Sequence, residues 1–253
     1  LPAENDAPIL QIKLSIEQKQ NLIALAKRRV DERIPVPYLT NEAWFAGERY
    51  YVNKDVLIPR SPLAETISNH FQPWLGDVEP RYILDLCTGS GCLAIYCAKQ
   101  FPYAHVDAVD ISLDALNVAK KNIITHQCVE RVHVLQSDLF AALQTKRYDI
   151  IISNPPYVGI EEMQSLPQEY LHEPELALAS GIDGLDITIK ILQQAKNYLT
   201  EDGLLIVEVG NSWYPLQEKY PNIPFVWLEF EFGGEGVFLL TAKNLREINL
   251  NAG

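Results

Sequence analysis

Short apolar runs alternate with helical patterns from Arg81 onward, and this alternation constrains the fold more strongly than any other feature of the sequence. The runs are rich in Val, Ile, Leu and Tyr and predict strands at residues 82–86, 106–110, 132–136, 148–153 and 204–209. Helices are expected between them, near residues 92–100, 113–126 and 186–199. Strands that alternate with helices are typical of βαβ units. We therefore predict an α/β domain with an open, mostly parallel sheet.

The C-terminal end of the chain departs from this alternation. Residues 225–231 and 236–241 have the composition of two strands, and the Gly-rich segment 232–235 joins them. Such a short connection suits antiparallel neighbours, because parallel strands need a long crossover. The sheet is therefore expected to end in an antiparallel C-terminal hairpin.

The residues before the alternation predict a smaller N-terminal region. After a loose tail over residues 1–14, Ser15 and Gln18 form a capping box for an amphipathic helix that should stop before Pro35. The aromatic-rich segment 43–58 indicates one or two hairpins, and a further helix is expected over residues 63–71. We divide the chain into an N-terminal helical and hairpin region (1–75) and an α/β domain (76–253).

Composition and charge limit the partners of the protein. The 253 residues contain 21 Lys and Arg against 33 Asp and Glu, a formal net charge of -12. This charge disfavours stable binding to nucleic acid, whose phosphates carry the same sign. No apolar run approaches the ~20 residues that cross a bilayer, and the start lacks a signal sequence. We therefore expect a cytoplasmic protein without a membrane partner, and the missing initiator Met indicates that upstream residues are absent.

The four cysteines, at positions 87, 92, 97 and 128, have neither CxxC nor zinc-knuckle spacing. We expect reduced thiols in a core and no metal site.

A Gly-rich turn, Cys87-Thr88-Gly89-Ser90-Gly91, follows the first predicted strand of the sheet and precedes a helix. Open α/β sheets bind ligands at this end of their strands. Gly89, Gly91 and Ala94 also satisfy the dinucleotide pattern G-x-G-x-x-G/A, which leaves a dinucleotide ligand open. Asp85, just before the turn, favours another ligand: a buried carboxylate would repel a pyrophosphate but could bind the amides of the turn and a cationic, amino-acid-like group.

Two further aspartates end neighbouring predicted strands. Asp110 lies 19 residues after Gly91, where an acidic side chain can accept hydrogen bonds from both hydroxyls of a ribose. Ser112 is the better N-cap for the following helix, which should leave Asp110 free for a ligand. Asp138 could accept from an exocyclic amine of a base, although an aspartate that forms a turn is an equal alternative.

The strongest chemical signal is Asn154-Pro155-Pro156-Tyr157, directly after a buried strand. Two successive prolines fix the backbone and force Asn154 into an extended conformation, so its side chain and the Pro155 carbonyl can face one point as acceptors. Two acceptors without a donor suit a planar NH₂ group, and Tyr157 could stack on that group. This arrangement indicates an enzyme that orients a weakly nucleophilic amide or aromatic amine.

These motifs resemble those of class I S-adenosylmethionine (SAM)-dependent methyltransferases over about residues 81–241, which implies a Rossmann-like fold. Within that class the sequence is most similar to the bacterial protein-(glutamine) methyltransferases of the HemK/PrmC/PrmB group. The segments Val56–Pro62 and His172–Gly181 extend the match. Cys87 and the run Arg33–Thr40 resemble the PrmB branch, which methylates a glutamine of a large-subunit ribosomal protein. The group carries a longer N-terminal region, so residues 1–75 are expected to be a truncated substrate-recognition part.

The resemblance implies a role for each motif. Asp85 and the turn from Cys87 through Thr88, Gly89 and Ser90 to Gly91 would wrap the methionine part of SAM. Asp110 and Ile111 would hold the ribose, and Asp138 with Leu139 would border the adenine. Asn154, which would also touch the cofactor, would bind the substrate glutamine with the Pro155 carbonyl, beside Pro156 and Tyr157. Arg60 is a candidate substrate contact, and a stabilising ion pair with Glu173 is an equal alternative.

The implied reaction moves the methyl group of SAM to the side-chain amide nitrogen of a glutamine in a large-subunit ribosomal protein, leaving S-adenosylhomocysteine. Four alternatives stay open. The substrate could be a peptide chain release factor, or an exocyclic amine of RNA or DNA, because the Asn154 bend suits any planar NH₂ group and Tyr157 could stack on a flipped base. The glycine pattern permits an NAD-dependent oxidoreductase. A scaffold without cofactor binding is the last alternative.

Overall fold

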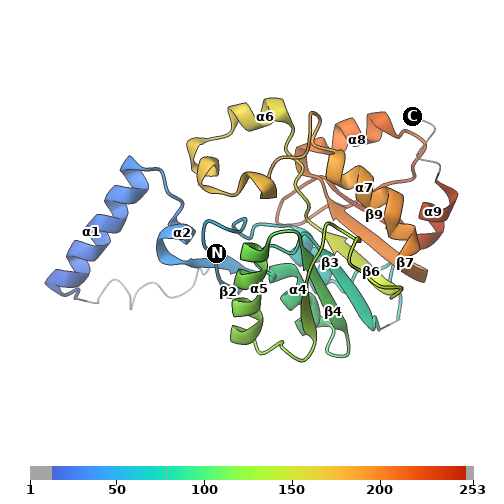
Figure 1. The fold of residues 1–253 in the computed structure, drawn as a ribbon, viewed down its shortest axis with the longest axis horizontal. Helices are drawn as coiled ribbons and strands as arrows, with labels where there is room; N and C mark the ends of the chain where they lie inside the picture. The colour runs from blue at the N-terminus through green and yellow to red at the C-terminus, as the bar shows by residue number, and fades with distance from the viewer. Residues whose placement is uncertain (1–12, 78, 249–253) are drawn as a thin grey trace.

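The computed structural model describes residues 13–77 and 79–248, so most of the predicted N-terminal tail lies outside the described residues. A seven-stranded sheet forms the centre of the molecule, in the order β5-β4-β3-β6-β7-β9-β8 (Figure 1). Its strands are β3 (Tyr82–Leu86), β4 (His105–Asp110), β5 (Val132–Gln136), β6 (Tyr148–Ser153), β7 (Leu199–Glu208), β8 (Val226–Trp227) and β9 (Val237–Thr241). The strands from β5 to β7 are parallel, and β9 and β8 continue the sheet antiparallel. The predicted mostly parallel α/β fold is confirmed.

Helices cover both faces of the sheet because successive strand residues point to opposite sides. Ile150 and Ile152 of β6 pack into the core on one face, which α4 (Cys92–Gln100) and the end of α5 (Leu113–Thr125) cover. Ile151 packs into the core on the other face. That face is covered by α7 (Asp186–Gln194), α8 (Trp213–Lys219) and α9 (Ala242–Glu247).

The N-terminal region contains α1 (Ile16–Asp31), α2 (Val36–Thr40), the strands β1 (Glu42–Phe45) and β2 (Glu48–Tyr51), and α3 (Leu63–Ser68). The capping box of Ser15 and Gln18 is present, and the aromatic-rich segment forms one hairpin. Phe45 and Leu63 pack into the same core cluster as α4. The boundary between residues 75 and 76 stays a proposal.

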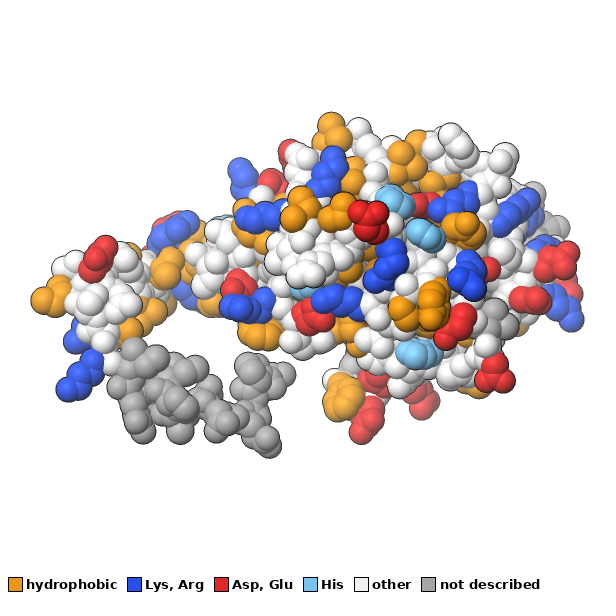
Figure 2. All heavy atoms as spheres, turned by 90° about the horizontal axis from the view of Figure 1, so that it is seen from below, with side chains coloured by type: hydrophobic (Ala, Val, Ile, Leu, Met, Phe, Trp, Pro, Cys, Tyr) orange, Lys and Arg blue, Asp and Glu red, His pale blue; other side chains and the backbone are white. Residues whose placement is uncertain are grey.

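Helix α1 projects from the rest of the molecule and buries none of its residues (Figure 1). Its basic end is tied to the segment after α6 (Ile160–Ser165) by an ion pair of 3.0 Å between Arg29 and Glu169. On the face seen in Figure 2, cationic and anionic side chains are interspersed. None of the helices within residues 13–77 and 79–248 is long and apolar enough to span a membrane.

The C-terminal hairpin is antiparallel as predicted, but its first strand is much shorter than residues 225–231. Only Val226 and Trp227 pair with β9, and the connection begins at Leu228 and runs to Gly236. Three glycines of this connection, Gly233, Gly234 and Gly236, have positive φ angles, which do not fit a strand. The apolar pattern of residues 228–231 therefore belongs to a loop that packs against the sheet core.

Gly91 is required by helix packing. It is the N-cap of α4 with φ +80°, and a Cβ atom there would lie 3.2 Å from the Cβ of Ala119 on α5. We expect Gly91→Ala to lower the free energy of unfolding by roughly 2–4 kcal/mol, because it adds a steric conflict to an unfavourable backbone conformation. Gly76→Ala is the matched control, since Gly76 has φ +60° but a Cβ atom there would have no atom of the described residues within 4 Å apart from its chain neighbours. Chemical denaturation should show the larger loss for Gly91→Ala, and equal losses would disprove the packing role.

Candidate functional site

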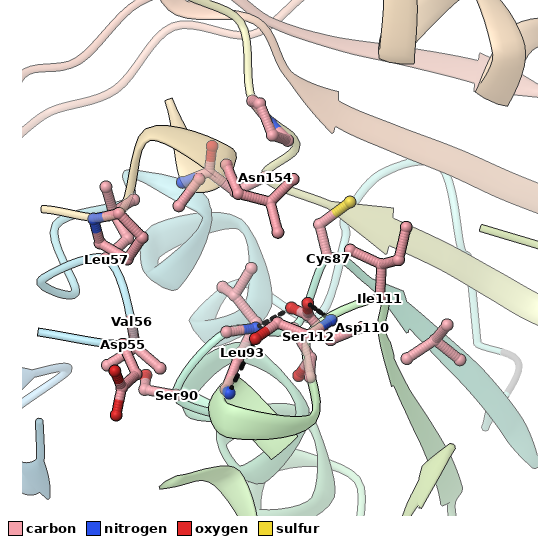
Figure 3. Close-up of a pocket in the computed structure, with 18 of the residues that line it drawn as sticks. Asp55, Val56, Leu57, Cys87, Ser90, Leu93, Asp110, Ile111, Ser112 and Asn154 are labelled. Atoms are coloured by element: carbon pink, nitrogen blue, oxygen red, sulfur yellow. Dashed lines mark hydrogen bonds between the residues drawn. The ribbon is translucent and has the colours of Figure 1, made fainter. Parts of the chain in front are cut away.

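A pocket opens at the carboxyl ends of β3, β4 and β6, where parallel α/β sheets bind their ligands (Figure 3). Many of the predicted site residues line this pocket together. They are Arg60, Cys87, Thr88, Gly89, Ser90, Asp110, Ile111, Asp138, Leu139, Asn154 and Pro156. Four other predicted residues, Asp85, Gly91, Pro155 and Tyr157, are not among the residues that line it.

Asp85 forms the base of the Gly-rich turn. Its side chain is fully buried, and Oδ2 accepts from Thr88 Oγ1 at 2.5 Å and from the Ala94 amide at 3.1 Å. Oδ1 has no hydrogen-bond partner among the described residues. Burial raises the pKa of Asp85 to about 7. Asp85 therefore contacts the turn through the Thr88 hydroxyl, and the amide that it binds is that of Ala94 in α4 rather than one of the predicted turn amides. A contact with a cationic ligand stays a prediction.

The raised pKa of Asp85 gives a testable pH dependence. Between about pH 4 and pH 7 the carboxyl group is ionised in the unfolded chain but protonated in the folded one, so unfolding releases a proton. The free energy of unfolding contributed by this group therefore falls as the pH rises through this window. The side chain of Asp85→Asn is neutral at every pH. The free energy of unfolding, measured by denaturation, should therefore decrease less between about pH 5 and about pH 8 for this variant than for the wild type. Equal losses in the two proteins would mean that Asp85 titrates normally.

Asp110 is held in place by the loop that it faces. Oδ2 accepts from the Gly89 amide and Oδ1 from the Ser112 amide, both at 2.9 Å (Figure 3). Ser112 also caps α5 through the Ala115 amide, as predicted. Asp110 is thus not free of protein contacts, contrary to the expectation. A carboxylate has about four acceptor positions, so each oxygen still has capacity for a ligand hydroxyl.

Asp138 and Leu139 continue the wall of the pocket beyond β5, next to Ile111 of the neighbouring strand end. Leu139 is buried and has a positive φ of 48°, which marks a tight turn. Asp138 is solvent-exposed. A carboxylate between apolar side chains suits the predicted role at a purine base, and this role stays a prediction.

Asn154 directly follows β6 and lines the pocket opposite the turn (Figure 3). Its Oδ1 atom is buried, yet none of the described residues donates a hydrogen bond to it. A buried amide oxygen without a partner is costly unless a ligand or water supplies the donor. Asn154 therefore lines the pocket and has unfilled acceptor capacity at Oδ1.

The bend after Asn154 is fixed by contacts from behind. The Tyr157 hydroxyl donates to Glu208 at 3.2 Å, and Ser212 Oγ donates to the Tyr157 carbonyl at 2.8 Å. Pro156 lines the pocket but Tyr157 does not. The predicted stacking of Tyr157 on a substrate amide therefore stays a prediction.

Two walls of the pocket, apart from Arg60, have no role predicted from the sequence. Residues 55–61 and 174–179 lie over it, and Glu173 joins them by accepting from the Ile58 amide at 3.2 Å and from Arg60 Nη1 at 2.7 Å. The Arg60 guanidinium also lies 5.1 Å above the Tyr170 ring. The ion pair considered for Arg60 is present, and Arg60 also lines the pocket, so a substrate contact stays a prediction. The motifs Val56–Pro62 and His172–Gly181 overlap these two segments and were the sequence signal that could have indicated them.

The residues of the pocket fit SAM. Asp110 offers unfilled acceptor positions beside the Gly-rich turn. A Cβ atom on Gly89 would have no atom of the described part of the chain within 4 Å, apart from its chain neighbours. The wall provides apolar side chains on either side of the strand ends, such as Ile111 and Leu139.

The fold and this pocket define the chain as a methyltransferase of class I. The family model described as the methyltransferase small domain matches residues 65–183. The solved structure of a methyltransferase from Pyrococcus furiosus has a similar fold, with a TM-score of 0.56 at 14% sequence identity over 89% of this chain and 98% of that one. Membership of this class implies that the chain uses SAM.

Two curated relatives define the family more closely. The ribosomal protein uL3 glutamine methyltransferase of Francisella tularensis subsp. tularensis is 48% identical over 241 residues, which cover 95% of this chain and 77% of that protein. The enzyme of the same name from Xanthomonas campestris pv. campestris is 48% identical over 235 residues, covering 93% and 76%. The chain belongs to this family of protein-glutamine methyltransferases. The predicted resemblance is confirmed, and the oxidoreductase alternative is wrong.

Proposed function

We propose that the protein methylates the side-chain amide nitrogen of a glutamine in ribosomal protein uL3, with SAM as the methyl donor. This proposal rests on Asn154, which lines a pocket that fits SAM and whose Oδ1 atom has no hydrogen-bond partner among residues 13–77 and 79–248. The names of the two relatives supply the substrate. The net charge of -12 supports a basic ribosomal protein as partner through long-range attraction. A ribosomal substrate places the reaction in the cytoplasm.

The protein contributes orientation to this reaction. A glutamine amide nitrogen is a poor nucleophile because its lone pair is delocalised into the carbonyl group. Asn154 Oδ1 and the Pro155 carbonyl would accept its two N–H groups and hold the nitrogen toward the methyl donor. When bound, SAM supplies a methyl group on a positively charged sulfur, which is strongly electrophilic. The two acceptors also stabilise the positive charge that develops on the nitrogen.

The proposal assigns the pocket residues as follows. The turn of residues 87–91 surrounds the methionine part of SAM, Asp110 accepts from the ribose hydroxyls, and Asp138 and Leu139 border the adenine. Residues 1–75 form the part that recognises the substrate protein. Arg60 belongs to this part and also lines the pocket, from the segment that leads into α3.

Methylation assays with three purified substrates test the proposal. The protein is incubated with SAM and with uL3, a peptide chain release factor, or ribosomal RNA, and mass spectrometry locates any added methyl group. We expect a mass increase of one methylene unit on a glutamine of uL3. A faster reaction with the release factor or with RNA would replace the proposed substrate, and failure to bind S-adenosylhomocysteine would favour a silent scaffold.

A further inference from the structure

Glu208 is a buried carboxylate next to the site that has no assigned role. It is the last residue of β7 and is 5% exposed. Its two oxygens accept from two different segments: Oε1 from the Tyr157 hydroxyl at 3.2 Å and Oε2 from Ser61 Oγ at 2.5 Å. One side chain thus connects the bend that carries Asn154 with the segment that carries Arg60.

The residues after Glu208 hold the same tyrosine. Gly210 has a φ of +45°, and a Cβ atom there would lie 2.6 Å from the Tyr157 ring, so the ring packs directly against the backbone. Ser212 Oγ donates to the Tyr157 carbonyl at 2.8 Å. The segment that ends β7 therefore contacts the hydroxyl, the ring and the backbone of Tyr157.

A buried carboxylate is costly, which argues against an incidental contact. Burial raises the pKa of Glu208 to about 7, while its bonds to Ser61 and Tyr157 and the nearby positive charge of Arg60 favour the ionised form. An apolar residue at the end of a buried strand would avoid this cost. The carboxylate is the group that can accept from both hydroxyls at once.

We infer that Glu208 is a positioning residue for methyl transfer, which orients Tyr157 and thereby the Asn154 bend relative to the wall that contains Ser61. This inference rests on the proposed function. Glu208 is not among the residues that line the pocket, so we assign it to positioning and not to accepting the proton of the methylated amide. A bend displaced by about 1 Å would slow the reaction by about a hundredfold, although no substrate contact is removed.

Kinetics of four variants test this role. Glu208→Ala should lower kcat by about ten- to a hundredfold, while the Kd for S-adenosylhomocysteine changes by less than about twofold. Glu208→Gln should recover most of the rate, because its amide oxygen can accept from Tyr157 and its NH₂ group can donate to Ser61. Tyr157→Phe removes the other end of the same hydrogen bond. The double variant Glu208→Ala/Tyr157→Phe should therefore be little slower than the slower single variant, which is the non-additivity of a shared interaction.

Asp149→Asn is the matched control. Asp149 accepts from the Arg81 and Tyr82 amides at the opposite end of the sheet, so its loss should lower stability without changing kcat. Two results would overturn the inference. In one, the rate losses of Glu208→Ala and Tyr157→Phe multiply in the double variant. In the other, Glu208→Ala leaves kcat as unchanged as Asp149→Asn does. The proposed function is tested separately, by whether the wild type methylates glutamine. The ratio of the kcat values of variant and wild type is measured on whichever substrate the wild type methylates, so it tests Glu208 alone.

Discussion

Replacing Asn154 by alanine should lower kcat for methyl transfer by about a hundredfold or more, the usual effect of removing one polar contact to the reacting group. Affinity for S-adenosylhomocysteine should stay nearly unchanged, because we assign the Oδ1 atom of Asn154 to the substrate amide. The structure supports this separation, since Oδ1 is buried in the pocket wall and has no partner within the described chain. Steady-state kinetics with uL3 and calorimetry with S-adenosylhomocysteine give the two quantities.

Asn244→Ala is a suitable control for this variant. Asn244 forms the capping box of α9 with Thr241, on the helix that covers the sheet face behind β7 and β9. Its removal should lower stability and leave kcat unchanged. If Asn154→Ala instead weakened binding of S-adenosylhomocysteine as strongly as it slowed transfer, Asn154 would belong to the cofactor part of the pocket, and the proposed glutamine site would lie elsewhere.

Replacing Asp110 by alanine should mainly weaken cofactor binding, by ~1–3 kcal/mol, or roughly 5- to 150-fold in Kd. A charge-assisted hydrogen bond to a ribose hydroxyl is lost, and the amides of Gly89 and Ser112 lose the acceptor that holds the turn. Both effects act on the cofactor rather than on the substrate amide. Calorimetric titration with S-adenosylhomocysteine measures the change.

A control for Asp110→Ala comes from the same strand. Asp107 accepts from Lys146 at 2.7 Å and from the Tyr148 hydroxyl at 2.7 Å, away from the pocket. Asp107→Asn should bind S-adenosylhomocysteine with the affinity of the wild type. An unchanged affinity in Asp110→Ala would contradict the assignment of Asp110 to the ribose hydroxyls.

Much of the central fold was predictable because local signals and packing agree there. The predicted bounds of β3, β5, β6 and α4 match the structure, since each element is a short apolar run bounded by turn residues. The end of the chain was less predictable. Residues 228–231 alternate apolar and acidic side chains as a strand would, but Leu228 and Phe230 pack against the sheet core from a loop whose glycines take positive φ angles. Local composition does not distinguish these two ways of burying apolar side chains.

Site residues were predictable where the motif that contains them lies at the end of a single strand. Asp110 and Asn154 each follow a recognisable strand, and both line the pocket. The contacts that hold them were not predictable, because they join segments far apart in the chain. Glu208 lies 51 residues from Tyr157 and 147 from Ser61, and no spacing in the sequence indicates that these three side chains meet.

A crystal structure with S-adenosylhomocysteine and a glutamine-containing peptide of uL3 would test the central claim most directly. The quantity to measure is the distance from the glutamine amide nitrogen to Asn154 Oδ1. We expect a hydrogen bond of about 2.7–3.2 Å, with the nitrogen facing the sulfur of the cofactor. A glutamine seated elsewhere, or an Asn154 side chain bonded to the protein and turned from the sulfur, would contradict the account.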